Sequence, residues 1–294
     1  MKVCVDIGSG RGYVARHLTG HSIEKLYCLE MSSSWLNQCE IPPEEENIKV
    51  EKIHIDEDNK RLPFDDESVD IVTSSLSLHW VNNLPGLFKE TNRILKKDGV
   101  FVGIMKHAIK FRKLYVLILQ YLYVLLGSMF GGDTLFELRG ALQLAELERE
   151  DGFGSHISPF VKVQDLGSLL NRTGFTMLTI DTDEIVVRFP SIMQLMRDLK
   201  GMGENNAGWS RKIGLKKDTI LAANAIYKHL YGLEDGSLPA NFQVYNWIAW
   251  KPHPKQPKPL SPQKSDISLK DLHKLDEVVT KVTKIKDDDE SGKS

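Results

Sequence analysis

The stretch "VDIGSGRGYV" at residues 5–14 joins an apolar run to three closely spaced glycines. A buried strand that runs directly into glycines is typical of a loop whose backbone closely approaches a ligand. A dinucleotide-binding loop has the spacing G-x-G-x-x-G, whereas Gly8, Gly10 and Gly12 follow G-x-G-x-G, with Asp6 two residues before the first of them. The loop therefore predicts a nucleoside ligand without a pyrophosphate.

Strand and helix patterns alternate along the chain. This alternation predicts a doubly wound, mostly parallel α/β sheet of seven strands, which binds its ligand at the carboxyl ends of the strands. Two late strands are expected to close the sheet in antiparallel fashion. The predicted strands are 2–8, 24–31, 48–56, 69–78, 100–105, 176–189 and 242–252, and the predicted helices are 12–18, 32–39, 84–99, 132–150, 163–175, 191–203 and 218–231.

Carboxylates at three predicted strand ends identify the ligand more closely. Asp6 would repel a phosphate but suits an ammonium group, directly or through water. Glu30 ends the second strand about 20 residues after the loop, where a carboxylate accepts hydrogen bonds from ribose hydroxyls. Asp56, after the third strand, is placed to accept from an adenine amino group. A ligand with an ammonium group, a ribose and an adenine but no phosphate is S-adenosylmethionine.

Composition argues against a nucleic-acid partner and against a zinc site. The 294 residues include 38 Lys and Arg against 40 Asp and Glu, so the net charge of −2 does not favour a nucleic-acid partner. Cys4, Cys28 and Cys39 lack the spacing of a zinc site and are predicted to be buried free thiols. The chain opens on its first core strand without a transit peptide, so we expect its first elements to be missing.

Several longer blocks resemble known families. The segments 5–13, 62–85 and 92–103 look like class I methyltransferases of the malonyl-carrier-protein type. The blocks 129–160 and 181–204 resemble one narrower family more closely. Together they resemble the mitochondrial complex I assembly factor 5 family, which consists of arginine hydroxylases with a class I, Rossmann-like, S-adenosylmethionine-dependent methyltransferase fold. The resemblance implies a protein of the mitochondrial matrix, peripheral to the inner membrane. Its implied partners are an iron–sulfur subunit of complex I, whose arginine it modifies, and other assembly factors.

The resemblance also implies roles for individual residues. The cofactor would lie against Asp6, Gly8, Gly10, Gly12, Glu30 and Asp56, with the backbone at Ser74 and Ser75 beside the sulfonium. His79 and Trp80 follow the fourth strand, where an imidazole and a flat ring suit a guanidinium, although a capping and packing pair explains them equally well. Asp133 is a candidate for orienting a cationic substrate side chain, or an N-cap for the helix after it.

Hydroxylation needs an oxidant, and S-adenosylmethionine is not one, so the sequence leaves the oxidant open. His54 and Asp56 match the His-x-carboxylate half of an iron site, with His79 or His156 as a third ligand. Because adenine explains Asp56 better, we predict no metal site.

One segment departs from the family pattern. Residues 106–128 lie between a strand and the block "MFGGDTL" that follows it directly in relatives, so they are interpreted as an insertion. Leu114 to Phe130 is slightly short for a membrane span, which needs about 20 apolar residues. It would suit a position in or on the inner membrane, and a translated intron is the favoured alternative.

The sequence predicts one folded domain followed by a flexible tail. Residues 1–252 form a methyltransferase-like domain, and residues 253–294 form a flexible Pro- and Lys-rich tail, in which Leu269 to Val282 could form an amphipathic helix. The predicted activity is arginine hydroxylation. The alternatives are methyl transfer to a carrier-protein thioester carboxyl or a protein side chain, and a chaperone without chemistry.

Overall fold

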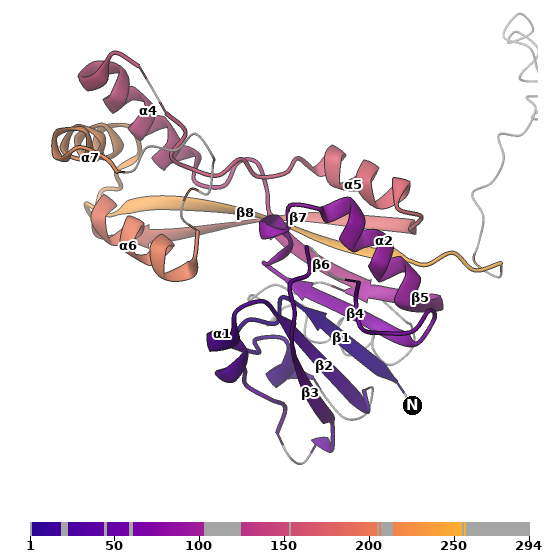
Figure 1. Ribbon diagram of the computed structural model, residues 1–294. Helices are drawn as coiled ribbons and strands as arrows, with labels where there is room; N and C mark the ends of the chain where they lie inside the picture. The colour runs from indigo at the N-terminus through magenta and orange to yellow at the C-terminus, as the bar shows by residue number, and fades with distance from the viewer. Residues whose placement is uncertain are drawn as a thin grey trace, which may run out of the picture. The chain divides into compact units, whose positions relative to one another are not determined.

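A mixed sheet organises the chain, and its strands follow the apolar runs of the sequence (Figure 1). Strands β1 to β4 are parallel in the order β3-β2-β1-β4, and β8 is antiparallel to all three of its neighbours, β5, β6 and β7. The bounds are β1 Val3–Ile7, β2 Lys25–Glu30, β3 Lys49–His54, β4 Val69–Ser75, β5 Leu95–Val102, β6 Leu125–Phe130, β7 Thr176–Phe189 and β8 Leu238–Trp250.

The computed structural model describes residues 2–18, 23–43, 46–58, 61–102, 125–152, 154–204, 206, 214–254 and 256. Residues 1–253 form one compact unit, and residues 254–294 form another. The predicted tail helix at 269–282 lies outside the described residues, as do positions 103–124, which include most of the predicted insertion. Within the described ranges, no helix has both the length and the apolar character that a membrane crossing requires.

Strands β5 and β6 share a single position in the sheet. Along β4, Val72 pairs with Phe101 of β5, and the next residue, Thr73, pairs with Leu126 of β6. The eight strands of the described chain therefore occupy seven positions, in the order β3-β2-β1-β4-β5/β6-β8-β7. This confirms the predicted seven-stranded fold.

The pairing with β8 gives the same register. Val102 of β5 and Leu126 of β6 both pair with Ile248. Val102 and Leu126 thus hold equivalent places in the sheet, so that Gly127 continues the strand from the position of Val102. In register terms, the interruption amounts to the 24 residues from 103 to 126.

Strand β8 supports two apolar cores on opposite faces. Successive side chains of a strand point to opposite faces. The even positions in the first half of β8 pack into one core, and the odd positions in its second half pack into the other. Leu238, Ala240, Phe242 and Val244 belong to the core under α4, α6 and α7, whereas Tyr245, Trp247 and Ala249 belong to the core of the parallel sheet.

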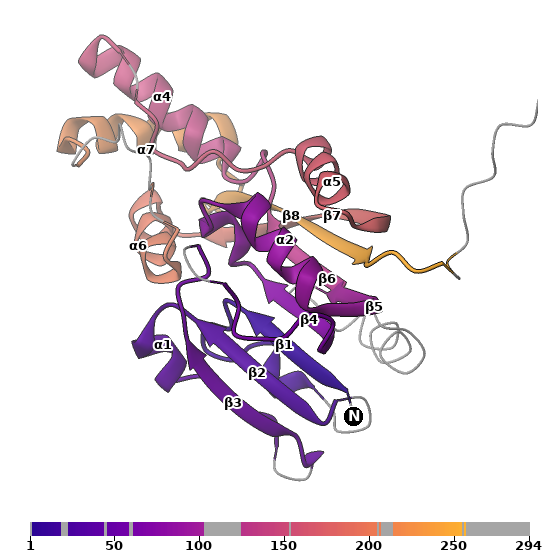
Figure 2. The same cartoon turned by 45° about the vertical axis from the view of Figure 1, so that its right-hand side comes forward.

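The helices cover these cores. Helices α2 and α5 lie over the sheet, while α4 and α7 pack side by side around the far half of β7 and β8 (Figures 1 and 2). Side-chain oxygens of Ser32, Asn83 and Ser191 cap α1, α2 and α6, as is typical of N-cap residues. The bounds are α1 Ser33–Asn37, α2 Leu84–Ile94, α4 Phe136–Glu150, α5 Val163–Arg172, α6 Ile192–Met202 and α7 Lys217–Tyr231.

Two predicted helices differ from the structure. The helix expected at 12–18 is only a 3-10 turn, Ala15–His17. The helix expected at 84–99 ends at Ile94, because the carbonyls of Arg93 and Ile94 accept hydrogen bonds from Glu67 and Ser68 and draw the chain into β5.

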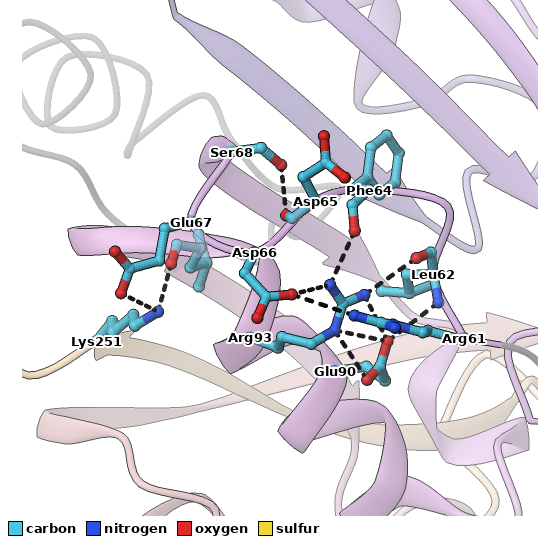
Figure 3. Close-up of polar contacts among 11 residues, drawn as sticks. Arg61, Leu62, Phe64, Asp65, Asp66, Glu67, Ser68, Glu90, Arg93 and Lys251 are labelled. Carbon is cyan, nitrogen blue, oxygen red and sulfur yellow. Dashed lines mark hydrogen bonds and ion pairs between the residues drawn. The ribbon is translucent and has the colours of Figure 1, made fainter.

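A polar network fixes the loop before β4, at the end of the sheet away from the glycine loop (Figure 3). The Arg93 guanidinium donates to Asp66 Oδ1 at 2.7 Å, to the Phe64 carbonyl at 2.8 Å and to Glu90 Oε2 at 2.8 Å. These acceptors hold the loop to the last turn of α2 and so set where β4 begins.

Candidate functional site

The three glycines of the loop after β1 have separate reasons to be glycine. All have positive φ, at 65°, 54° and 82° for Gly8, Gly10 and Gly12. A Cβ on Gly8 would lie 2.3 Å from Ser77 Oγ, and one on Gly12 would lie 2.2 Å from the Glu40 carbonyl. A Cβ on Gly10 would meet only Trp35, at 3.9 Å. Packing therefore requires Gly8 and Gly12, whereas Gly10 presents an open backbone.

Glu30 lies at the end of β2, as predicted, and holds the loop in place. Its Oε2 accepts the Gly10 N–H at 2.9 Å, and its Oε1 accepts the Ser32 N–H at 2.9 Å. The side chain is buried. Each carboxylate oxygen has a further lone pair, so Glu30 can still accept from the hydroxyls of a ribose.

Asp6 is buried beneath the loop, between β1 and β4. Its Oδ1 accepts the Thr73 hydroxyl at 2.7 Å, while its Oδ2 is buried without a hydrogen-bond partner. Burial raises the pKa of Asp6 to about 7, and the nearby charge of Glu30 adds to this effect. The residue is therefore a carboxyl group that a neighbouring positive charge would ionise.

Glu57 is a site residue that the sequence analysis missed. Its Oε1 is buried without a hydrogen-bond partner, and burial raises its pKa to about 7, an effect that the nearby Gly8 backbone opposes. The run "HIDED" carries three acidic residues, and strand position alone favours Asp56. In the structure, Asp56 Oδ1 accepts the Asp58 N–H at 3.1 Å, which forms a local turn beside the loop.

The end of β4 closes the other side of the loop. Ser74 is fully buried, and its hydroxyl donates to the Ile7 carbonyl at 2.9 Å, while Ser75 is half-buried. The next residue, Leu76, has a φ of 50°, an uncommon conformation for a leucine, and its N–H donates to the Ser128 carbonyl. This turn joins the cofactor side of the sheet to the 3-10 turn Leu78–Trp80.

His79 forms a buried pair with Glu204, which no sequence pattern indicated. The imidazole Nε2 lies 2.9 Å from Glu204 Oε1, and both side chains are 7% exposed. The other ring nitrogen, Nδ1, is buried without a hydrogen-bond partner. Glu204 follows α6 and is 125 residues away in the sequence, so only the fold brings the two together.

Aromatic side chains surround this pair. The His79 ring lies 5.6 Å from Trp80, 5.3 Å from Phe130 and 6.1 Å from Phe160, measured between ring centroids. Trp80 is 39% exposed and presents part of its ring at the surface. The arrangement can hold a flat cation such as a guanidinium, by stacking and by charge.

Asp133 is exposed and does not cap α4. Its Oδ2 accepts from the Gln243 side-chain amide at 3.2 Å, and its N–H donates to Gln243 Oε1 at 3.3 Å. The N-cap position of α4 is Leu135, which makes no side-chain cap. The predicted N-cap role is therefore wrong, because the chain at 131–134 is bonded to β8 and the helix begins after it.

The histidines of the rejected iron site lie apart. His54 Nε2 is 2.7 Å from the Met31 carbonyl, His79 pairs with Glu204, and His156 Nε2 is 2.9 Å from Glu146 Oε1. In the part of the chain that the structure describes, no three His, Cys, Asp or Glu side chains are arranged to hold a metal ion. The three cysteines are buried free thiols, as predicted.

The site fits S-adenosylmethionine. Asp6 and Glu57 each leave one buried carboxylate oxygen unpartnered beside the loop, and a ligand with positive charge would satisfy this deficit. Gly10 leaves room at the backbone, and Glu30 retains acceptor capacity for hydroxyl groups. The donor set thus matches a cationic nucleoside better than a phosphate.

Known proteins with similar sequences indicate the family to which this chain belongs. The methyltransferase domain family matches residues 5–103. Proteins named arginine-hydroxylase NDUFAF5, mitochondrial, are 44% identical in Danio rerio, over 93% of this chain and 76% of that protein, and 45% identical in Mus musculus, over 95% and 72%. A malonyl-[acyl-carrier protein] O-methyltransferase of Nitrosospira multiformis is 30% identical over 86% of this chain and 77% of its own length.

Among solved structures, the YcgJ protein of Bacillus subtilis has the same fold. It aligns with a TM-score of 0.50 at 12% identity and covers 86% of this chain and 92% of its own. The strand order and this likeness confirm the predicted class I methyltransferase fold. By its identity with those relatives along almost its whole length, the chain belongs to the arginine-hydroxylase NDUFAF5 family.

Proposed function

We propose that this protein binds S-adenosylmethionine at the glycine loop and hydroxylates an arginine of an iron–sulfur subunit during the assembly of respiratory complex I. One observation carries the proposal. The acidic set Asp6, Glu30 and Glu57 surrounds the loop, and the buried His79–Glu204 pair lies past the end of the adjacent strand β4. The first group suits a cationic cofactor, and the second suits a guanidinium.

The cofactor side of the proposal follows from charge. S-adenosylmethionine carries a sulfonium and an ammonium group and, when bound, supplies an activated methyl group. Asp6 and Glu57 have pKa values near 7, so a bound cation favours their ionised forms. Glu30 would orient the ribose from its place between the Gly10 and Ser32 N–H groups.

The substrate side rests on His79. Because Glu204 holds the Nε2 edge of the ring, the orientation of the imidazole is fixed and Nδ1 is left for another group. Trp80 offers a flat, partly exposed ring beside it. Together they would position a guanidinium, with Trp80 stacked on it and Nδ1 of His79 accepting one of its N–H groups. Adding an oxygen atom to that side chain also needs an oxidant, which stays unassigned.

The relatives named as mitochondrial arginine hydroxylases support this activity and a mitochondrial location. We place the protein in the matrix, peripheral to the inner membrane, with the iron–sulfur subunit and other assembly factors as partners. The predicted insertion at 106–128 lies mostly outside the described residues, so it does not enter this placement, which follows from the family.

Methyl transfer is a second candidate, favoured by the 30% identity to a malonyl-[acyl-carrier protein] O-methyltransferase. In-line transfer from the cofactor would need only positioning of the acceptor and exclusion of water. The acceptor would be a carrier-protein thioester carboxyl or a protein side chain.

The test is the intact mass of the iron–sulfur subunit after co-expression with the wild-type protein, with Glu30→Ala, and with Glu234→Ala as an exposed control. The proposal expects a gain of one oxygen atom with the wild type and the control, and none with Glu30→Ala. A gain of one methyl group would establish methyl transfer instead. An unchanged mass with restored assembly would favour a chaperone.

A further inference from the structure

A second site lies beside the candidate substrate site, in a cavity of about 350 Å³. Its lining residues are Gly132, two residues of α4, and residues of the segment that leads from α4 to α5. Arg139, His156 and Lys162 supply its basic groups, and Pro159 and Phe160 supply part of its apolar wall. Among the described residues that line it, none carries a carboxylate.

Within the described chain, Arg139 and Lys162 have no acidic partner, whereas His156 pairs with Glu146. The Arg139 guanidinium donates only to the carbonyls of Gly132 and Thr134, at 3.3 to 3.4 Å. Lys162 is exposed, and no ion pair involves it. A half-buried guanidinium beside neutral carbonyls keeps its full charge and has N–H groups to spare. The cavity is therefore electropositive.

Two carboxylates of the described chain lie close to this cavity. Asp133, which follows the lining residue Gly132, accepts from the Gln243 side-chain amide. Glu146 is fully buried behind His156, with its Oε1 2.9 Å from the imidazole Nε2 and its Oε2 accepting the Gly154 N–H. It therefore does not cancel the charge of Arg139 and Lys162, which face the cavity from other positions. The net charge presented to a ligand is positive.

Phe160 connects this cavity with His79. Its ring lines the cavity, lies 6.1 Å from the His79 ring and lies 5.6 Å from Phe130, measured between centroids. A peptide whose cationic side chain lies at His79 would therefore bring its neighbouring residues to the cavity. The two sites together suit a polypeptide with two charged side chains close in sequence, a basic one at His79 and an acidic one at the cavity.

We propose that the cavity binds a carboxylate side chain of the substrate polypeptide, close in sequence to the modified arginine. The apolar wall at Pro159 and Phe160 suits the methylene groups of Glu or Asp, whereas a phosphate has none. Arg139 would bind the carboxylate through its fork of N–H groups, and Lys162 would add charge at the rim. This inference rests on the proposed function, because it takes the His79 site to hold an arginine.

The test uses peptides in which one Arg and one Glu are separated by one to four glycines, with Gln in place of Glu as the matched series. Binding to the full chain is measured by fluorescence anisotropy with S-adenosylmethionine present. We expect at least one Glu peptide to bind about tenfold more tightly than its Gln counterpart, in keeping with a charge-assisted hydrogen bond. This preference should vanish in Arg139→Gln and weaken in Lys162→Gln.

Arg149→Gln is the matched control, because Arg149 lies on the same helix and pairs with Glu148 instead of lining the cavity. Equal binding of Glu and Gln peptides at every spacing would overturn the inference. Binding of cardiolipin vesicles that depends on Arg139 would also overturn it, in favour of a lipid phosphate. S-adenosylmethionine binding by each variant is measured separately, so a failure of the proposed function is recognised as loss of that binding or of the mass gain.

Discussion

The imidazole Nε2 of His79 lies 2.9 Å from the carboxylate Oε1 of Glu204, and each of the two side chains is only 7% exposed to solvent. Burying two such groups is unfavourable unless they bond to each other, and removing one leaves the other without a partner. The pair therefore makes the end of β4 and the end of α6 depend on each other.

Substitution of Glu204 tests this pair. Glu204→Gln keeps a hydrogen-bond acceptor for Nε2 but removes the carboxylate beside the ring. We expect modification of the iron–sulfur subunit to fall by about 10²-fold, the usual effect of a general acid–base group, with unchanged affinity for S-adenosylmethionine. Glu204→Ala should also lower the free energy of unfolding by about 1–3 kcal/mol, because it leaves a buried imidazole unpaired.

The measurements for this prediction are modification rates by intact mass and unfolding in urea. His229→Gln, an exposed histidine on α7, is the control. If Glu204→Gln retains the wild-type rate, the pair has only a packing role.

The binding of S-adenosylmethionine should depend on pH through Asp6 and Glu57. Burial raises both pKa values to about 7, and a cationic ligand prefers the ionised carboxylates. We expect affinity to fall by about tenfold for each group between pH 8 and pH 6, measured by isothermal titration calorimetry. Asp6→Asn should remove much of this dependence, whereas Asp235→Asn, at an exposed turn, should keep it. A flat profile in the wild type would contradict the assignment.

Stability without the ligand should have the opposite trend. The pKa of a carboxyl group in the unfolded chain is about 4, so between about pH 4 and pH 7 the folded protein binds more protons than the unfolded one. The contribution of Asp6 and Glu57 to folding is therefore complete below about pH 4 and is lost as the pH rises through about 7. Thermal melts from pH 6 to pH 8 should show a declining Tm, which Asp6→Asn makes shallower.

Alanine substitution at two glycines of positive φ separates the cost of backbone strain from the cost of a steric clash. Gly12 has a φ of 82°, and a Cβ there would overlap Glu40, whereas Gly236 has a φ of 78° and open space around it. Gly236→Ala should cost about 1–2 kcal/mol from conformation alone. Gly12→Ala should cost more and abolish ligand binding, because the loop must move away from Glu40. Equal losses in urea unfolding would show that the contact at Glu40 relaxes.

The shared position of β5 and β6 predicts that one deletion is tolerated. Removing residues 103–126 joins Val102 to Gly127 in the register that both β4 and β8 impose. Gly127 then stays under Trp247, where a Cβ would lie 1.7 Å from the indole ring. We expect this variant to fold cooperatively and to bind S-adenosylmethionine, as measured by circular dichroism melts and calorimetry.

A deletion one residue shorter provides the control. Removing 103–125 places Leu126 where Gly127 was and turns each following side chain of the strand to the opposite face, so it should abolish cooperative unfolding. Should both deletions behave alike, the register does not define the strand.

Seven strands depend on local pattern, and the sequence predicted them, whereas it missed β6, most of which falls within the predicted insertion 106–128. The strand at 176–189 was predicted with its observed bounds, and Glu30 lies beside the glycine loop because parallel strands end at one edge of the sheet. Gly174 ends α5 with a φ of 90°, as expected of a glycine at that place.

The missed features depend on contacts between distant segments. Glu204 follows a helix with no motif around it, and its partner is 125 residues earlier. Glu57 was passed over for Asp56, because only the packing of the loop decides which carboxylate of "HIDED" lies beside Gly8. The helix predicted to reach Gly99 ends at Ile94, since bonds from the preceding loop to its last carbonyls outweigh the apolar period.

The two hydrogen bonds of Glu30 have a consequence for how the cofactor arrives. Because this carboxylate accepts the N–H groups of Gly10 and Ser32, contacts within the protein itself fix the conformation of the loop. Such preorganisation means that little chain entropy is lost on association. For the proposed cofactor, S-adenosylmethionine, we therefore expect the affinity to be determined by contacts at the loop instead of by the ordering of the chain.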